Sequence, residues 1–308
     1  MTAAPHERRL AREAARRSRA RRQAVISAVS TIVLLGGLVL VVVTSQGWPT
    51  VRDAFFSPSD FADSFPAVLR GFWTDVKLFL IVEVVVLVLG LVVALVRTSR
   101  TAALFPVRLI AAVYTDLFRG LPAILTILLI GQGFARFSQS IFGPSPYPLG
   151  IIALSLIASA YIGEIFRAGI QSVDKGQGEA CRALGMSYAK SMRLVVVPQG
   201  VRRVLPALVN QFIAIVKDSS LVYFLGLLVS ERELFRVGQD AAVLSGNLSP
   251  LVMAGIFYLV ITVPLTHLVN YFDNRFRTGR RRPTPPTSGL KEVTELDAAS
   301  PLITGSNT

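Results

Sequence analysis

Residues 164–203 read EIFRAGIQSVDKGQGEACRALGMSYAKSMRLVVVPQGVRR, a polar and basic stretch that follows one apolar segment and precedes another. A simple connection between two helices is usually much shorter than this. Gly176 and Gly178 are expected to break the chain, and residues 179–186 to form a short helix after them. Three apolar residues share one side of this helix: Ala180, Ala183 and Leu184. Such a helix either protrudes as a plug for another protein or lies flat on a membrane surface, and its pattern supports both arrangements equally.

The composition of the whole chain is that of an integral membrane protein. Among the 308 residues, 52% are hydrophobic and only 17% are charged, whereas charged residues make up about 25% of an ordinary soluble domain. Lys and Arg outnumber Asp and Glu by 32 to 19, which gives a formal net charge of +13. Most of this excess lies in residues 1–23 and 273–282, where it is typical of anchoring on anionic lipid. The lipid bilayer is therefore an expected partner, and nucleic acid is not.

Six apolar segments are expected to cross the bilayer, since about 20 residues of helix span its core. Four of them are plain from their length and low charge: residues 24–44, 78–96, 149–163 and 251–272. The other two carry more charge: one is centred on residues 121–134, and one starts at Val204 and contains Lys217 and Asp218. Pro122 removes a backbone hydrogen bond from the third segment and predicts a kink there. The fold class is therefore an all-α integral membrane protein with about six transmembrane helices.

Positive charge also predicts the orientation of the chain, because cytoplasmic loops hold most of the Lys and Arg of a membrane protein. With the N-terminus inside, the cytoplasmic segments hold 23 Lys and Arg residues and the outer segments hold six. Both termini are therefore expected in the cytoplasm. The first apolar run is too long for a cleavable signal peptide and is expected to remain as a helix. Residues 276–308 are basic and then rich in Pro, Ser and Thr, which predicts a disordered tail.

The residues needed for catalysis or metal binding are largely missing from the sequence. Cys181 is the one cysteine, and His6 and His267 are the two histidines, so a metal site built on these residue types is not expected. The chain has neither a phosphate-binding G-x-x-x-x-G-K-[ST] loop nor a G-x-S-x-G nucleophile elbow. An intramembrane enzyme is thus disfavoured, and a transporter of this sequence would need a separate motor to move solute uphill.

The stretch quoted first resembles the signature of the membrane-spanning subunits of ATP-binding-cassette importers. That signature is E-A-A, three residues, G, nine residues, and then I-x-L-P. This chain has the same spacing in three pieces: Glu179-Ala180-Cys181, Gly185, and Val195-Val196-Val197-Pro198. Cys replaces the second Ala, and Val replaces both Ile and Leu, so each departure keeps a small or apolar side chain.

Further short matches resemble the polar amino acid branch of this family. They are Glu164 and Arg167, Gly176-Gln177, Pro198-Gln199, Phe118-Arg119-Gly120-Leu121-Pro122, and Lys217-Asp218-Ser219-Ser220-Leu221. Leu121 departs from the Thr that is common in the family. The resemblance covers residues 70–275, and so leaves out the basic tail 1–23, the first span 24–44 and the tail 276–308.

The resemblance implies a type I importer permease in the bacterial cytoplasmic membrane. Such a subunit pairs with a second copy or a paralogue, docks on a dimer of cytosolic ATPases, and receives a polar amino acid from an extracytoplasmic solute-binding protein. The chain itself would be no enzyme and hold no cofactor, because the ATP is used by the partner. A cytoplasmic coupling helix would contact the ATPase through Gly176, Gln177, Glu179, Ala180, Cys181, Leu184, Gly185 and Pro198. Gly185 is expected to allow the close approach of a neighbouring backbone.

Polar and charged residues inside the spans are candidates for the substrate pathway: Glu83, Arg119, Lys217, Asp218, Ser219 and Ser220. A charge that faces lipid costs about 2.5 to 3.5 kcal/mol, so these side chains are expected to face the protein interior. Lys217 either contacts the solute or forms an internal bridge with Glu83. Ser219 and Ser220 favour a break in the helix after Asp218.

A channel or an ion-coupled carrier that works without a motor is the alternative function. In that case the charged residues within the spans would form a relay for the coupling ion: Glu83, Lys217 and Asp218. Uptake that requires ATP but no ion gradient would distinguish the importer from this alternative.

Overall fold

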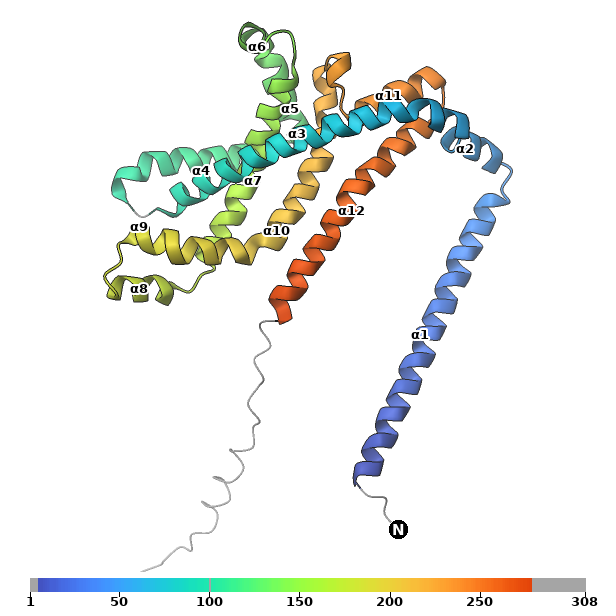
Figure 1. Cartoon of the computed structure of the whole chain (residues 1–308), viewed down its shortest axis with the longest axis horizontal. Coiled ribbons are helices and arrows are strands. Elements are labelled where there is room, and N and C mark those ends of the chain that lie inside the picture. The colour runs from blue at the N-terminus through green and yellow to red at the C-terminus, as the bar shows by residue number, and fades with distance from the viewer. Residues whose placement is uncertain (1–4, 100, 279–308) are drawn as a thin grey trace, which may run out of the picture. The chain divides into compact units, whose positions relative to one another are not determined.

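The computed structural model describes residues 5–99 and 101–278, and every regular element in these residues is a helix (Figure 1). The predicted all-α class is therefore confirmed. Residues 276–278 end the last helix, and the rest of the predicted disordered tail lies outside the described residues.

Five stretches of helix in the described part of the chain are long and apolar enough to cross a membrane. They are Arg21–Val43 in α1 (Pro5–Val43), Trp48–Thr98 with α2 (Trp48–Phe55) and α3 (Pro58–Thr98), Tyr147–Gln171, which is α7, Tyr188–Leu225 with α9 (Tyr188–Ser191) and α10 (Val197–Asp218), and Ser249–Val269 in α12 (Ser249–Thr278). A sixth span exists if the bent pair α4 (Phe105–Gly120) and α5 (Ala123–Gly133) counts as one. With this bent pair counted as one span, the prediction of about six transmembrane helices is confirmed.

The bend between α4 and α5 measures 109° and falls at Pro122. Leu121 adopts an extended conformation, with ψ of 143°, as residues before a proline commonly do. Its N–H still donates to the carbonyl of Leu117 at 3.1 Å and closes the last turn of α4. Pro122 has no N–H with which to continue the helix. The predicted kink is therefore confirmed, and it is sharp enough to make residues 105–120 a separate helix, which the sequence analysis missed.

The chain divides into two compact units. Unit 1 consists of Met1–Leu80, Gly131–Gly150 and Ser219–Leu259, and unit 2 consists of Ile81–Ile130, Ile151–Asp218 and Val260–Thr308. The short helices α2, α6 (Ala135–Phe142) and α11 (Leu234–Ser245) belong to unit 1, whereas α8 (Lys175–Ala183) and α9 belong to unit 2. Each unit therefore has its own short helices in addition to the segments that are long enough to span a membrane.

The core of unit 1 lies where the first half of α3 packs against α11 and the start of α12. Its buried residues are Val68, Leu234, Met253 and Ala254, with Phe61, Phe72, Val237, Phe257 and Tyr258 packed around them. Gly71 makes this packing possible, because a Cβ atom at its position would lie only 3.1 Å from the Cα atom of Leu234. Helices α3 and α11 are thus in backbone contact at Gly71.

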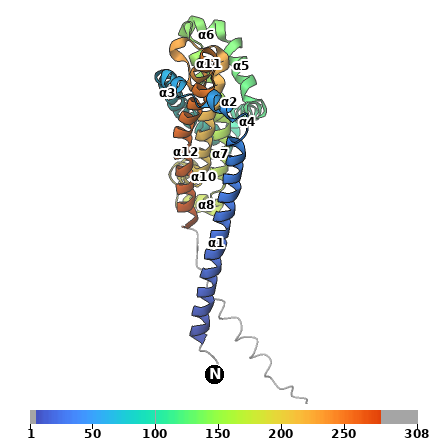
Figure 2. The same ribbon diagram turned by 90° about the vertical axis from the view of Figure 1, so that its right-hand side faces the viewer.

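Helix α1 contributes no described side chain to this core. It runs unbroken from Pro5, within the basic segment, through the predicted first span (Figure 2). Every residue of Arg21–Val43 is exposed. The segment that was expected to be a separate basic tail is therefore the first part of a long helix from Pro5 onward, and the apolar side chains of Arg21–Val43 are covered by nothing in the described chain.

Candidate functional site

The stretch 164–203 is mostly helical, and it is not a long open loop. Helix α7 continues to Gln171, α8 and α9 follow as two short helices, and five residues of π-helix, Met192–Val196, lead into α10 (Figure 1). Pro198 is the second residue of α10. Helix α8 contacts both α9 and the π-helical turn. The importer signature therefore begins on α8 and ends at the start of a helix that belongs to a candidate span.

Helix α8 begins four residues earlier than the sequence predicted, at Lys175. The Asp174 side chain caps it, because a carboxylate oxygen accepts a hydrogen bond from the N–H of Gly176 at 2.7 Å. The expectation that Gly176 and Gly178 break the chain is therefore wrong, since both lie inside α8. A strong cap at the first turn offsets the low helix propensity of these glycines.

The other end of α8 is closed by a Schellman turn at Gly185. The N–H of Gly185 donates to the carbonyl of Arg182 at 2.9 Å, and the N–H of Met186 donates to that of Cys181 at 3.0 Å. Gly185 has φ of +81°, in the left-handed region that favours glycine. A Cβ atom at this position would meet nothing within 4 Å in the described chain. The observed reason for glycine is thus the backbone conformation, and its predicted closeness to a partner stays a prediction.

Exposure separates the eight predicted coupling residues into two groups. Cys181 is buried, with 8% of its surface exposed. The other seven are exposed, and Leu184 is the extreme case at 83%: Gly176, Gln177, Glu179, Ala180, Leu184, Gly185 and Pro198. The apolar side of α8 is therefore accessible to a partner.

An ion-pair cluster holds together the ends of α3 and α7, which precedes α8 in unit 2. Glu164 accepts a hydrogen bond from Arg97 at 2.8 Å and from Nε of Arg167 at 2.9 Å, and the second guanidinium nitrogen of Arg167 contacts its other oxygen. Glu164 and Arg167 were expected from the sequence, whereas Arg97 was not. No local pattern points to Arg97, because it comes from a helix 67 residues away.

The six candidate pathway residues are divided between the two units. Glu83, Arg119, Lys217 and Asp218 belong to unit 2, and Ser219 and Ser220 belong to unit 1. The guanidinium of Arg119 lies over the ring of Tyr161, 5.5 Å from its centroid. Neither carboxylate oxygen of Glu83 accepts a hydrogen bond in the described chain, so the bridge from Lys217 to Glu83 is not formed.

The helix break that was expected after Asp218 takes a specific form. Helix α10 ends at Asp218, and Ser219–Leu225 continues as a 3₁₀ helix. Ser219 is buried, with 1% of its surface exposed. The change in helix type confirms that regular α-helix stops at this point, but the segment after it is a tighter helix and is not unwound.

Two buried carboxylates in unit 1 were not found from the sequence. Asp75 is 2% exposed and lies beside the hydroxyl groups of Ser219 and Tyr258, yet neither of its oxygens accepts a hydrogen bond of normal geometry. Glu233 is 0% exposed and caps α11 by accepting the N–H groups of Phe235 and Arg236. Burial, followed by the nearby carboxylate of Asp75, raises the pKa of Glu233 to about 8. Asp75 precedes the apolar run that starts at Leu78, and this position was its only signal in the sequence.

Comparison with known proteins points to one family. Residues 86–278 match the profile of the binding-protein-dependent transport system inner membrane component. The chain is similar to the arginine transport system permease protein ArtQ of Bacillus subtilis (strain 168), with 33% identity over 213 residues, which covers 69% of this chain and 94% of that protein. It is also similar to the glutamate/aspartate import permease protein GltK of Escherichia coli O6:H1, with 33% identity over 226 residues, 71% of this chain and 98% of that protein.

Solved structures share the fold. The crystal structure of an amino acid ABC transporter with histidines superposes with a TM-score of 0.60 and 33% identity, over 70% of this chain and 96% of that one. The methionine ABC transporter MetNI, in an inward-facing conformation, superposes with a TM-score of 0.53 over 71% of this chain and 98% of that one. At 21% identity, the second likeness supports the fold alone.

Proposed function

Because the chain belongs to the family of binding-protein-dependent transport system inner membrane components, we propose that it forms the membrane pathway of an ATP-driven importer for polar amino acids. The observation that carries this proposal is the importer signature on α8, an exposed helix with a cap at one end and a fixed turn at the other. The relatives named above transport arginine and glutamate or aspartate, which supports a polar amino acid as the solute.

Helix α8 is the proposed docking element for a dimer of cytosolic ATPases. The exposed side chain of Leu184 would gain about 1.5 to 3 kcal/mol on full burial in an ATPase cleft. Because α8 contacts the π-helical turn that leads into α10, a push on α8 reaches a membrane helix directly. Movement of the motor would in this way change the packing of the spans and so the side of the membrane to which the pathway opens.

The proposed solute contacts lie where α10 ends. Lys217 and Asp218 carry opposite charges at the junction with the 3₁₀ helix, which suits the carboxylate and ammonium groups of a free amino acid. Arg119, at the end of α4, and the hydroxyls of Ser219 and Ser220 are the further candidates, together with Glu83. The chain needs no cofactor for this role, since ATP is consumed by the partner.

The proposed assembly contains a second permease, identical or paralogous, the ATPase dimer and an extracytoplasmic solute-binding protein. The chain is a multi-pass membrane protein, and we place it in the bacterial cytoplasmic membrane with both termini in the cytoplasm. The excess of Lys and Arg on the inner segments supports this orientation.

Reconstitution of the permease with its ATPase and binding protein in proteoliposomes tests the proposal. Uptake of labelled amino acids from a panel should require ATP and should persist when ion gradients are collapsed. Asp218→Asn should raise the apparent KM or change the preferred amino acid while the basal ATPase activity remains. Uptake that an ion gradient drives without ATP would overturn the proposal, and unchanged kinetics in Asp218→Asn would overturn only the assignment of Asp218.

A further inference from the structure

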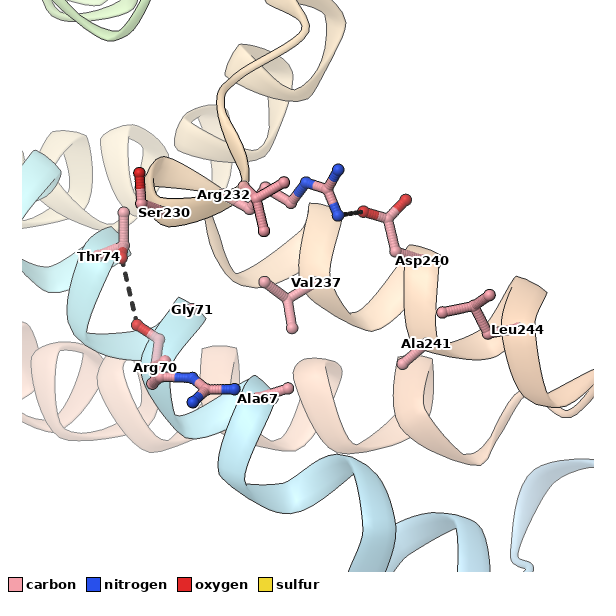
Figure 3. Close-up of a pocket in the computed structure, with 11 residues that line it drawn as sticks. Ala67, Arg70, Gly71, Thr74, Ser230, Arg232, Val237, Asp240, Ala241 and Leu244 are labelled. Atoms are coloured by element: carbon pink, nitrogen blue, oxygen red, sulfur yellow. Dashed lines mark hydrogen bonds and ion pairs between the residues drawn. The ribbon is translucent and has the colours of Figure 1, made fainter. Parts of the chain in front are cut away.

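A groove of about 630 Å³ lies within unit 1, between the first part of α3 and α11 (Figure 3). Its third wall is the turn that carries Val229 and Arg232. The groove is separate from α8 and from all six candidate pathway residues, none of which lines it.

The walls of the groove are largely apolar. Ala67 and Gly71 on α3 face Val237 and Ala241 on α11, and Leu244 continues this surface with 88% exposure. Gly71 forms part of the floor without a side chain, because a Cβ atom there would lie 3.1 Å from Cγ2 of Val237. Val237, Ala241 and Leu244 thus form an apolar wall along α11, which suits a flexible hydrocarbon chain.

The charged side chains around the groove are mostly positive. Arg70 is exposed and forms no ion pair in the described chain. Arg232 pairs with Asp240 at 2.9 Å, but its Nε is buried and donates to nothing in the described chain. Arg236, next to the groove, shares the same carboxylate at 3.0 Å. Figure 3 shows Arg70 and Arg232 on two sides of the groove, with Val237 between them. Among the residues that line the groove, two guanidinium groups and one carboxylate leave a net positive charge at this site.

The sequence places this groove at the level of lipid head groups. Arg70 precedes Leu78, where the charge-poor part of the span begins, by eight residues, or ~12 Å of helix. Trp73 lies between them and is 55% exposed. Tryptophan and arginine at the end of an apolar span are typical of the interface between membrane and water.

We propose that this groove binds an anionic phospholipid, with the phosphate between Arg70 and Arg232 and one acyl chain along Val237, Ala241 and Leu244. The positive field selects an anionic head group, and the apolar wall distinguishes a lipid from a free anion, which would gain nothing from that wall. Lipid binding at this groove requires only that the chain is embedded in a membrane, whichever solute the chain carries.

Lipid counting by native mass spectrometry on the purified, complete transporter tests the proposal. The complex is exchanged into detergent with equal amounts of phosphatidylglycerol and phosphatidylcholine. Bound phosphatidylglycerol should exceed phosphatidylcholine, and Arg70→Gln should weaken its binding by about fivefold. Ala241→Trp, which fills the apolar wall and leaves every charge in place, should lower the count as well. Arg52→Gln is the matched control, because Arg52 is an exposed arginine of unit 1 that pairs with Asp53 and does not line the groove.

Three results would overturn the assignment. Equal retention of the two lipids would show that the groove does not select an anionic head group. Full displacement of phosphatidylglycerol by inorganic phosphate would show a site for a free anion. Loss of permease association in Arg70→Gln and Ala241→Trp, with unchanged lipid counts, would assign the groove to a protein interface.

Discussion

Helices α8 and α11 use the same chemistry at their ends in opposite surroundings. Each begins at an acidic cap, Asp174 or Glu233, and each ends before a glycine with a positive φ, at Gly185 or Gly246. Asp174 is exposed, whereas Glu233 is 0% exposed. Similar end signals therefore do not reveal whether a short helix belongs to a core or is presented to a partner.

The faces of the two helices account for the difference. Leu234, Gly238 and Ala242 of α11 are buried, and Leu234 is part of the core of unit 1. On α8 only Cys181 is buried. Helix α11 is thus fixed by its own chain, and α8 keeps its apolar side available. Substitutions on α11 should accordingly change stability, and substitutions on α8 should change association with the ATPase.

The largest difference is expected between two leucines. Leu234→Ala removes a fully buried side chain from the core of unit 1 and should lower the free energy of unfolding by about 2 to 5 kcal/mol. Leu184→Ala removes an exposed one and should change it by less than about 0.5 kcal/mol. Thermal unfolding in detergent measures both, and a pull-down of the ATPase should fail only for Leu184→Ala. Equal destabilisation by the two substitutions would contradict the contrast between the helices.

The next largest difference in the free energy of unfolding is expected between removal of the Glu233 cap and removal of the Asp174 cap. Glu233→Ala leaves the part-buried N–H groups of Phe235 and Arg236 without an acceptor and should cost about 2 to 3 kcal/mol. Asp174→Ala leaves the N–H of Gly176, an exposed residue, to bond with water and should cost about 1 kcal/mol. The same unfolding assay compares them, and a larger loss in Asp174→Ala would reverse the assignment of buried and exposed caps.

The pH dependence of stability should distinguish the caps as well. The pKa of Glu233 rises from 4.5 to about 8 on burial beside Asp75. Folding therefore takes up a proton between these values, and the free energy of unfolding should fall as the pH rises from about 5 to about 8. The titratable groups that face Glu233 are Asp75 on α3 and Tyr258 on α12. Arg236 contributes only its backbone N–H, since its side chain is paired with Asp240. Glu233→Gln should flatten the curve, and an equally steep curve in that variant would assign the titration to another group.

The effect on folding that is expected at Gly185 is small, similar to that of removing the Asp174 cap. Gly185→Ala places a Cβ atom on a backbone with φ of +81° and should cost about 1 kcal/mol through the backbone alone. Gly185→Trp should fold and insert similarly, since nothing lies within 4 Å of the Cβ position, but should abolish ATPase binding and transport. Normal pull-down and transport by Gly185→Trp would remove the turn from the docking surface.

Features with a local cause were predicted well from the sequence. Pro122 predicted the bend because the missing N–H is a property of the residue itself, and the spacing from Glu179 to Pro198 predicted the family. The start of α8 was misplaced because the cap of Asp174 outweighs two unfavourable glycines. Asp75 and Glu233 were missed because their burial depends on the packing of α3 against α11 and α12, segments far apart in the sequence.

The continuity of α1 sets a length scale for the N-terminal part of the chain. From Pro5 to Gln23 the helix extends ~28 Å before the apolar part begins, almost the thickness of the bilayer core. Electrostatic attraction to lipid is screened within ~10 Å at moderate ionic strength. If α1 lies along the membrane normal, only about the last seven residues before Ala24 are within that distance of the lipid. A fluorophore attached near Pro5 would then lie in the aqueous space, well away from the lipid surface. Energy transfer from this fluorophore to a dye in the lipid would measure the tilt of α1 relative to the membrane normal.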